Sequence, residues 1–240
     1  MHFKFERFHA AGITLATCAA SVAPSIQAPA QNPEMVQKLQ EIKAASAANK
    51  QALSHYTWQE LQTISLKGEV KKTTTYEVVV GPDGQQQKTE IGGSPTAAPS
   101  GGRLKQHIVA KKKEEYQEYG EQIAALAKQY TRPDPQLLDQ AYKAGNISAK
   151  LDGTPGMVSL IVKKYLKPND QMSLVFNRQL KALEGIQVNS YLNDPTDVVT
   201  LTVTFDKLPN GINHVSTVQV NGVSKQLGVN MQNLNYQPRQ

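Results

Sequence analysis

The stretch VVTLTVTFDKLPNGINHVSTVQVNG, residues 198–222, contains the clearest strand pattern in the sequence. Apolar residues occupy every second position from Val199 to Phe205, which is the period of a strand with one buried face. The turn residues LPNG follow at 208–211, and the chain then returns through a second β-branched run. Asn-Gly at 221–222 is typical of a tight hairpin turn. The stretch therefore predicts consecutive antiparallel strands.

The same pattern extends in both directions from this stretch. Toward the N-terminus, alternating apolar residues recur from Val158 to Val162, from Met172 to Phe176 and at Ile186 and Val188. Toward the C-terminus, Leu227, Val229 and Met231 complete the set. We expect about six antiparallel strands from Met157 onward.

A second strand-rich block precedes the middle of the chain. Aromatic and β-branched residues dominate from Tyr56 to Val80, and the turn GPDG at 81–84 precedes a run, 85–91, that can return as a hairpin partner. The pattern predicts about three strands. The segment GGSPTAAPSGG, residues 92–102, has no periodicity and predicts a flexible loop.

Helical periodicity appears in two places. Asn32-Pro33-Glu34 is typical of a helix start and predicts a helix over 33–53. A helical insertion is expected over 104–145, with a break at Pro133, a restart at Asp134-Pro135 and an end at Gly145. Hairpin-linked strands with segregated helices predict an α+β fold, with the helices packed on one face of an antiparallel sheet.

Residues 1–30 have the pattern of a secretory signal peptide. A short charged segment precedes an apolar run that begins at Ala10, and Ala28-Pro29-Ala30 resembles a cleavage site. We expect cleavage after Ala30, a single exported domain over 31–240, and a periplasmic or secreted location. The alternative is a lipoprotein acylated at Cys18, because LATC at 15–18 resembles a lipobox.

Composition narrows the chemistry of the mature chain. Cys18 is the single cysteine, so cleavage after Ala30 removes every thiol and excludes disulfides and thiolate catalysis. The formal net charge is +6. A positive charge favours anionic envelope components as partners, and we expect no nucleic-acid partner, because no nucleic-acid motif accompanies it.

The usual catalytic and metal-binding motifs are missing from the sequence. His55, His107 and His214 stand alone, with no second ligand at metal-binding spacing. We therefore expect no metal, no cofactor and no enzymatic activity. An enzyme would require His214 within reach of Asp206 at an open cleft.

Two sets of side chains are candidates for binding. Rings and one aliphatic side chain along the middle helix, together with Trp58, could line an apolar cavity under the helices that holds a lipid or an acylated protein. The alternative is that they form the core. This set is Trp58, Tyr116, Tyr119, Ile123, Tyr130 and Tyr142. A basic helix face could instead contact an anionic membrane surface or a partner in a non-enzymatic structural role. This second set is Arg103, Lys105, Lys111, Lys112 and Lys113.

The layout also carries a family resemblance. A signal peptide, an N-terminal helix, a first strand with Tyr56-Thr57-Trp58 and helices inserted mid-chain resemble the LolA/LolB-like lipoprotein-carrier fold of the bacterial envelope. The stretches Leu66-Lys67-Gly68-Glu69-Val70 and Leu208-Pro209-Asn210-Gly211 also resemble uncharacterised exported bacterial proteins. The resemblance implies a curved, half-barrel-like sheet closed by helices, with a cavity that holds acyl chains.

Overall fold

The computed structural model describes residues 37, 40, 44, 47–94, 103–131, 133–151, 153–180 and 182–239, without the side chains of 103–110. The expected signal peptide and its cleavage site lie outside these residues, as do most of the first expected helix and positions 95–102 of the expected loop.

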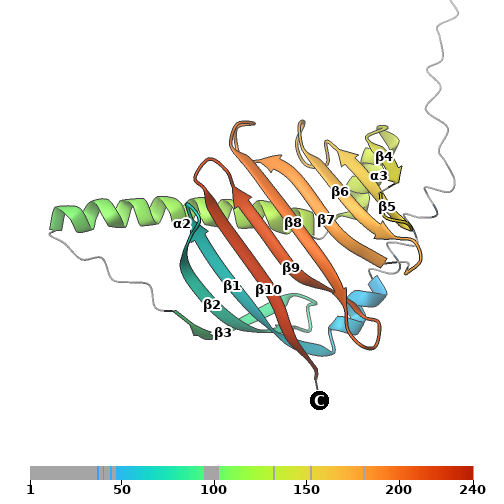
Figure 1. The fold of residues 1–240 in the computed structure, drawn as a ribbon, viewed down its shortest axis with the longest axis horizontal. Coiled ribbons are helices and arrows are strands. Elements are labelled where there is room, and N and C mark those ends of the chain that lie inside the picture. Colours follow the sequence, from blue (N-terminus) through green and yellow to red (C-terminus); the bar gives the residue numbers. More distant parts are fainter. Residues whose placement is uncertain are drawn as a thin grey trace, which may run out of the picture. The chain divides into compact units, whose positions relative to one another are not determined.

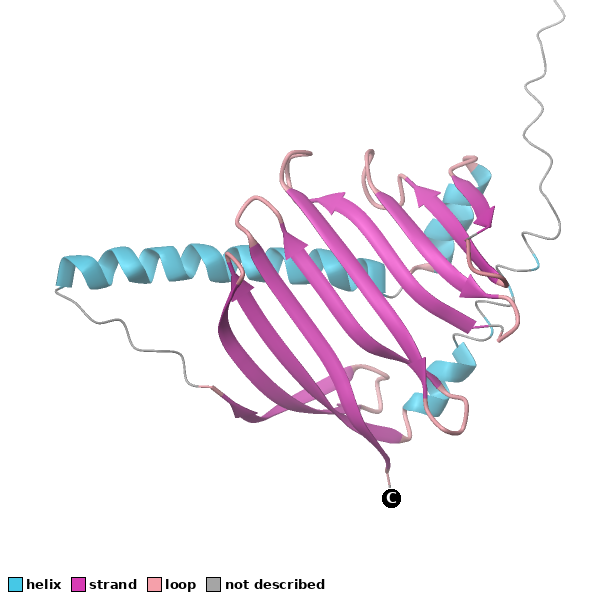
Figure 2. Cartoon of the chain, viewed as in Figure 1, coloured by secondary structure: helices cyan, strands magenta, loops and turns pink. Residues whose placement is uncertain are grey.

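Ten described strands form one antiparallel sheet, which curves in the ribbon view (Figures 1 and 2). Their order across the sheet is β3-β2-β1-β10-β9-β8-β7-β6-β5-β4. The strands are β1 (Tyr56–Leu66), β2 (Glu69–Val80), β3 (Gln86–Gly93), β4 (Ile147–Leu151), β5 (Met157–Lys163), β6 (Gln171–Asn177), β7 (Ala182–Tyr191), β8 (Val198–Lys207), β9 (Asn213–Gly222) and β10 (Leu227–Pro238).

The pairing of β1 with β10 makes one sheet from the two strand-rich blocks of the sequence. The two strands run antiparallel along nearly their whole lengths, from Tyr56 opposite Pro238 to Leu66 opposite Leu227. All the remaining strand pairs join strands that are consecutive in sequence. One long-range ladder therefore joins the first block to the second.

Two described helices follow β3, and residues 47–53 form part of a third before β1. They are α2 (Arg103–Thr131) and α3 (Pro135–Lys143). Asp134 caps α3, because its Oδ1 accepts a 2.7 Å hydrogen bond from the amide of Gln136, and Pro135 occupies the first turn. Gly145 follows with a φ of +70°, which ends the helix at the expected residue.

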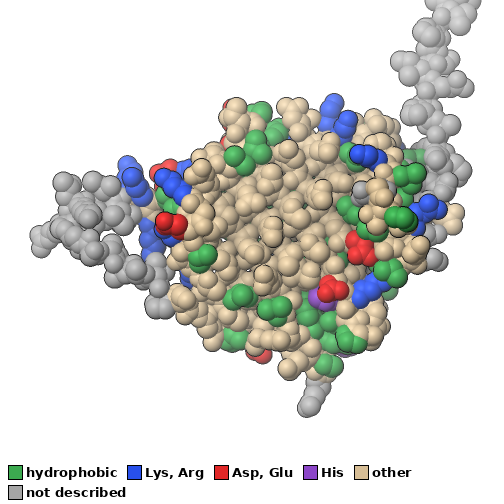
Figure 3. Space-filling view, viewed as in Figure 1, with side chains coloured by type: hydrophobic (Ala, Val, Ile, Leu, Met, Phe, Trp, Pro, Cys, Tyr) green, Lys and Arg blue, Asp and Glu red, His purple; other side chains and the backbone are tan. Residues whose placement is uncertain are grey.

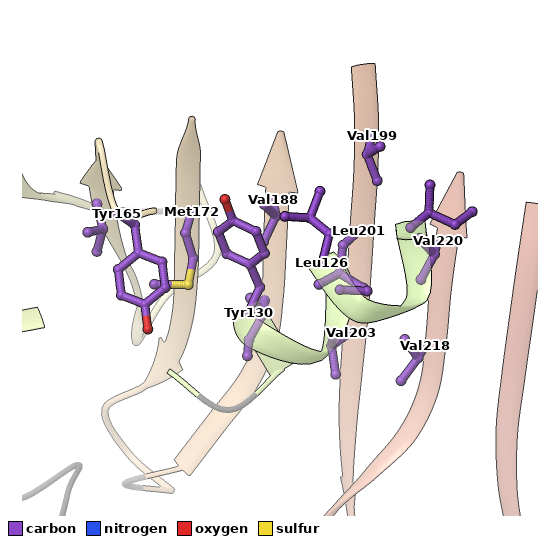
Figure 4. Close-up of a cluster of buried hydrophobic side chains, with 14 of the residues drawn as sticks. Leu126, Tyr130, Tyr165, Met172, Val188, Val199, Leu201, Val203, Val218 and Val220 are labelled. Carbon is purple, nitrogen blue, oxygen red and sulfur yellow. The ribbon is translucent and has the colours of Figure 1, made fainter. Parts of the chain in front are cut away.

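The core lies between the helices and one face of the sheet (Figure 4). Leu126 and Tyr130 of α2 point toward valines and leucines of the strands, and α3 packs against β5. Each fully buried Val, Leu or Ile side chain stabilises the fold by roughly 1.5–3 kcal/mol. The expected α+β class, the curved sheet and the helices on one face are thus confirmed.

The opposite face of the sheet is polar but largely uncharged. In the space-filling view, few hydrophobic or charged side chains appear at its centre, and the charged groups gather at the margins (Figure 3). Thr202 and Thr204 of β8 and Gln219 and Asn221 of β9 are exposed, whereas their sequence neighbours are mostly buried. This alternation is the one that the sequence predicted for a sheet with one buried face.

Three local details differ from the sequence expectations. Asn221 and Gly222 lie within β9, and the turn comes later, with Gln226 taking a positive φ of 51°. Gly222 is needed for packing instead, because an added Cβ would lie 2.4 Å from the Tyr119 ring. Residues 92–93 belong to β3, and β4 is an additional strand whose mostly exposed residues lack an apolar alternation.

Candidate functional site

A cavity of about 2,660 Å³ lies on the helix-bearing face of the sheet. Its walls come from α2, α3, the helical residues 47–53 and strands at both ends of the sheet. Small-molecule pockets in proteins usually measure roughly 300–1,000 Å³. This space is therefore large enough for a ligand with long chains.

Most of the strand side chains that line the cavity are apolar. On β1 and β10, Ile64, Leu66, Val229 and Met231 contribute in steps of two residues, as expected for side chains on one face of a strand. Leu160, Leu174, Phe176, Phe205, Val218 and Val220 continue this lining across β5, β6, β8 and β9. A mostly apolar wall with a few polar groups is typical of sites that bind small molecules.

The six candidate ligand-binding residues fall into two groups. Trp58, Tyr116 and Tyr142 line the cavity. Tyr119, Ile123 and Tyr130 are buried in the packed core between α2 and the sheet. The structure therefore brings three of the six to the cavity wall.

The core tyrosines are held by specific hydrogen bonds. The Tyr119 hydroxyl donates to Asp197 Oδ1 at 2.8 Å and lies 3.1 Å from Ser224 Oγ. The Tyr130 hydroxyl donates to Asp170 at 2.5 Å and lies 2.9 Å from Ser190 Oγ. Burial raises the pKa of both phenols, and the neighbouring carboxylates raise it further. These groups anchor α2 to the sheet.

One end of the cavity is polar and aromatic. Glu60 of β1 accepts hydrogen bonds of 2.5 and 2.7 Å from Lys88 of β3. The Trp58 ring stacks on Tyr236 with centroids 5.3 Å apart, and Trp58 Nε1 donates to Asn233 Oδ1 at 3.2 Å. All five residues line the cavity. Burial, followed by the negative charge of Glu60, raises the pKa of Tyr236.

Sequence reasoning found only Trp58 in this polar group. The other four residues lie on β1, β3 and β10, which are distant in sequence and meet only through the sheet order. One clue was available, because Glu60 follows Trp58 by two residues and so faces the same side of the strand.

The candidate basic face is only partly described. Lys111, Lys112 and Lys113 are exposed on α2, and Lys113 also lines the cavity. The side chains of Arg103 and Lys105 lie outside the described residues.

A pair close to the lysine run ties α2 to the turn after β9. Lys225 forms an ion pair with Glu115, and its hydrogen bond holds the pKa of that carboxyl below the usual range. The Lys225 ammonium also lies 5.8 Å from the Tyr116 ring centroid and 5.4 Å from that of Tyr119. Lys225 therefore contacts α2 beside Tyr116, which lines the cavity.

Asp206 and His214 are opposite each other in the β8–β9 ladder, but no hydrogen bond joins them among the described residues. His214 Nδ1 lies 3.2 Å from the Val215 carbonyl oxygen instead. Within the described residues no group of three or more His, Cys, Asp or Glu side chains could hold a metal ion, and no helix has the length and apolarity needed to cross a membrane.

A curved antiparallel sheet with helices over one face and a cavity between them is the arrangement that the sequence resemblance implied. The described residues thus form an open, curved sheet with helices over one face (Figure 1).

The solved structures that are similar to this chain include three that cover 83–85% of it. They are a DUF1329 family protein from Desulfovibrio piger (10% identity, 85% of this chain and 92% of that chain covered, TM-score 0.40), a putative outer membrane lipoprotein-sorting protein domain from Vibrio parahaemolyticus (6%, 85% and 92%, 0.41) and a LolA superfamily protein from Nitrosomonas europaea (7%, 83% and 94%, 0.38). No protein-family model and no curated protein sequence matches the chain.

Proposed function

We propose that this protein is an exported envelope protein that binds an apolar or acylated ligand, a lipid or the acyl chains of a lipoprotein, in the cavity under α2 and α3. The supporting observation is the volume of about 2,660 Å³ combined with an apolar lining to which β1, β5, β6, β8, β9 and β10 contribute. An apolar surface of this extent would be costly to leave against water without a binding role. The proposed role is binding and carriage, without a chemical reaction.

Trp58 offers a direct readout of occupancy. It is the single tryptophan of the chain and it lines the cavity. A brominated octadecanoate that enters the cavity is expected to quench its fluorescence in a saturable way. The Trp58→Phe variant, which has no tryptophan, controls for signal from the ligand itself.

Native mass spectrometry of protein purified from its own host complements this measurement. We expect lipid masses to co-purify with the folded chain. A clean mass of the bare protein, together with no saturable quenching by brominated acyl chains, would overturn the proposal.

Lys111, Lys112 and Lys113 favour an additional surface role. They lie exposed in one turn of α2, and Lys113 reaches the cavity wall. Anionic lipid surfaces attract such clusters by about 1 kcal/mol for each lysine near the surface. Contact of this turn with an anionic membrane would place the cavity beside its source of ligand.

A further inference from the structure

The row of β1 side chains that faces the cavity changes character along the strand. Ile64 and Leu66 make its aliphatic end, and Trp58 and Glu60 make its polar end, with Gln62 between them. Alternate residues of a strand share one face, so these five side chains, spaced two residues apart, form a row that changes from polar to aliphatic. The β1 side of the cavity therefore changes from apolar to polar along the strand, while Lys72 of β2, opposite Ile64, also lines the cavity.

The polar end contains an ion pair between a buried carboxylate and a lysine side chain that is 36% exposed. Glu60 is 5% exposed, and both of its carboxylate oxygens accept hydrogen bonds from the Lys88 ammonium. Removing such a carboxylate from water is expensive unless it is paired. An ammonium has three N–H donors. The two bonds to Glu60 leave Lys88 one donor for another acceptor.

Other side chains at this end of the cavity are fixed by contacts with one another. Asn233 accepts from Trp58 Nε1 and donates through Nδ2 to the Val215 carbonyl at 2.9 Å. The Tyr236 ring lies between Trp58 and His214, with centroid distances of 5.3 and 4.2 Å. Locked neighbours of this kind are what a preorganised binding site needs.

The charge on the cavity lining decides which polar group fits. Eight lysines but only three acidic residues, Glu60, Glu121 and Asp139, line it. A cleft lined with one sign of charge between apolar walls concentrates ligands of the opposite sign. This imbalance favours an anion over a cation or a neutral group.

We infer that the Lys88–Glu60 pair, framed by Trp58, Asn233 and Tyr236, binds the oxyanion of an anionic amphiphile whose hydrocarbon chain lies along Ile64 and Leu66. Lys88 donates its remaining N–H to the oxyanion, and Glu60 positions the ammonium. A carboxylate and a phosphate share this chemistry. The inference rests on the proposed function, since it specifies which ligand the cavity prefers.

The test compares ligands with one hydrocarbon chain and different head groups. Hexadecanoate, hexadecyl phosphate, hexadecanol and hexadecyltrimethylammonium compete with a brominated octadecanoate, and recovery of Trp58 fluorescence gives their affinities. We expect either or both anions to bind about ten-fold more tightly than the alcohol, the amount that one charge-assisted hydrogen bond provides. Their order distinguishes a carboxylate from a phosphate as the preferred head group.

Variants of the pair distinguish binding by Lys88 itself from attraction by the other lysines of the lining. Glu60→Gln keeps an acceptor for Lys88 and removes the competing negative charge, so anions are expected to bind at least as tightly. Glu60→Gln/Lys88→Met removes both charges without leaving a lone buried carboxylate, and it is expected to abolish the preference for anions. The variant Lys128→Met lacks a lysine from elsewhere in the lining, and it is expected to keep most of the preference for anions.

The outcomes separate this inference from the proposed function. Equal binding of the anions and the alcohol, tighter binding of the cation, or a preference for anions that survives in the double variant would overturn the inference and leave the carrier proposal standing. Failure of every hexadecyl ligand to compete, with no quenching by the brominated chain, would overturn both.

Discussion

The Tyr130 hydroxyl donates a 2.5 Å hydrogen bond to Oδ2 of Asp170, joining the last turn of α2 to the loop between β5 and β6. Asp170 also accepts from the backbone amides of Tyr165, Leu166 and Lys167 at 2.7–3.0 Å. One buried carboxylate thus fixes both a helix end and a loop. The position of α2 over the cavity depends on this junction.

Tyr130→Phe is expected to lower the free energy of unfolding by about 1–3 kcal/mol, because it leaves Asp170 and Ser190 short of a buried partner. Urea denaturation measures the change. Tyr76→Phe is the control, since its hydroxyl forms no hydrogen bond among the described residues. Equal losses in the two variants would contradict the anchoring role.

Gly222→Ala should destabilise the fold by about 1–3 kcal/mol through overpacking. The new Cβ would lie 2.4 Å from Tyr119 Cε1 and 2.5 Å from its hydroxyl oxygen. Gly92→Ala, at a site with open space, is the control. Combining Gly222→Ala with Tyr119→Leu relieves the clash, so the two effects on the denaturation midpoint should be less than additive. Additive losses would mean that the ring is not the obstacle.

Ala124 and Ala125 are exposed neighbours on α2, but only Ala124 lines the cavity. Ala124→Phe should therefore reduce the quenching of Trp58 by a brominated octadecanoate, because the ring takes up cavity volume. Ala125→Phe should leave the quenching unchanged. Both variants should keep the free energy of unfolding within about 0.5 kcal/mol of that of the parent protein, as surface substitutions usually do. Identical ligand binding by the two would argue that acyl chains bind elsewhere.

Stability should fall in alkaline solution. Burial raises the pKa of Tyr119, Tyr130, Tyr165 and Tyr236 above the ordinary value of 10.0. Above that pH the unfolded chain loses phenolic protons that the folded chain keeps, so the unfolded state binds fewer protons and the free energy of unfolding decreases as pH rises. The stabilisation is complete below the unfolded pKa.

Urea denaturation from about pH 8 to about pH 11 measures this slope across the range in which unfolded tyrosines ionise. Tyr130→Phe and Tyr236→Phe should each make the decline shallower. A slope that neither substitution changes would mean that other groups cause the alkaline loss.

The triple variant Lys111→Gln/Lys112→Gln/Lys113→Gln should bind vesicles of phosphatidylglycerol more weakly by about 1 kcal/mol per lysine at low salt. Co-sedimentation measures the binding, and added salt should weaken that of the parent protein. The control makes the same change in net charge at exposed lysines that do not line the cavity, Lys150, Lys163 and Lys164. An equal loss of vesicle binding in the control would mean that net charge alone, and not the position of Lys111, Lys112 and Lys113, causes the binding.

The sequence by itself determined the local elements. Period-two alternation in 198–205 and helical spacing before Pro133 specify a strand and a helix, because each pattern fixes which side chains share a face. The Asp134-Pro135 start of α3 and its end at Gly145 follow from backbone chemistry alone. The α+β class follows from the order of these elements.

Tertiary structure decided what local patterns do not encode. The β1–β10 ladder joins residues more than a hundred and fifty positions apart, and only that pairing brings Trp58 to Tyr236 and Glu60 into the same wall as Asn233. Tyr116 and Tyr119 look alike in the helical stripe, yet Tyr116 lines the cavity while Tyr119 is buried against Gly222. Periodicity gives the face of a helix. Whether that face meets a packed core or an open cavity depends on how far the sheet curves away beneath it.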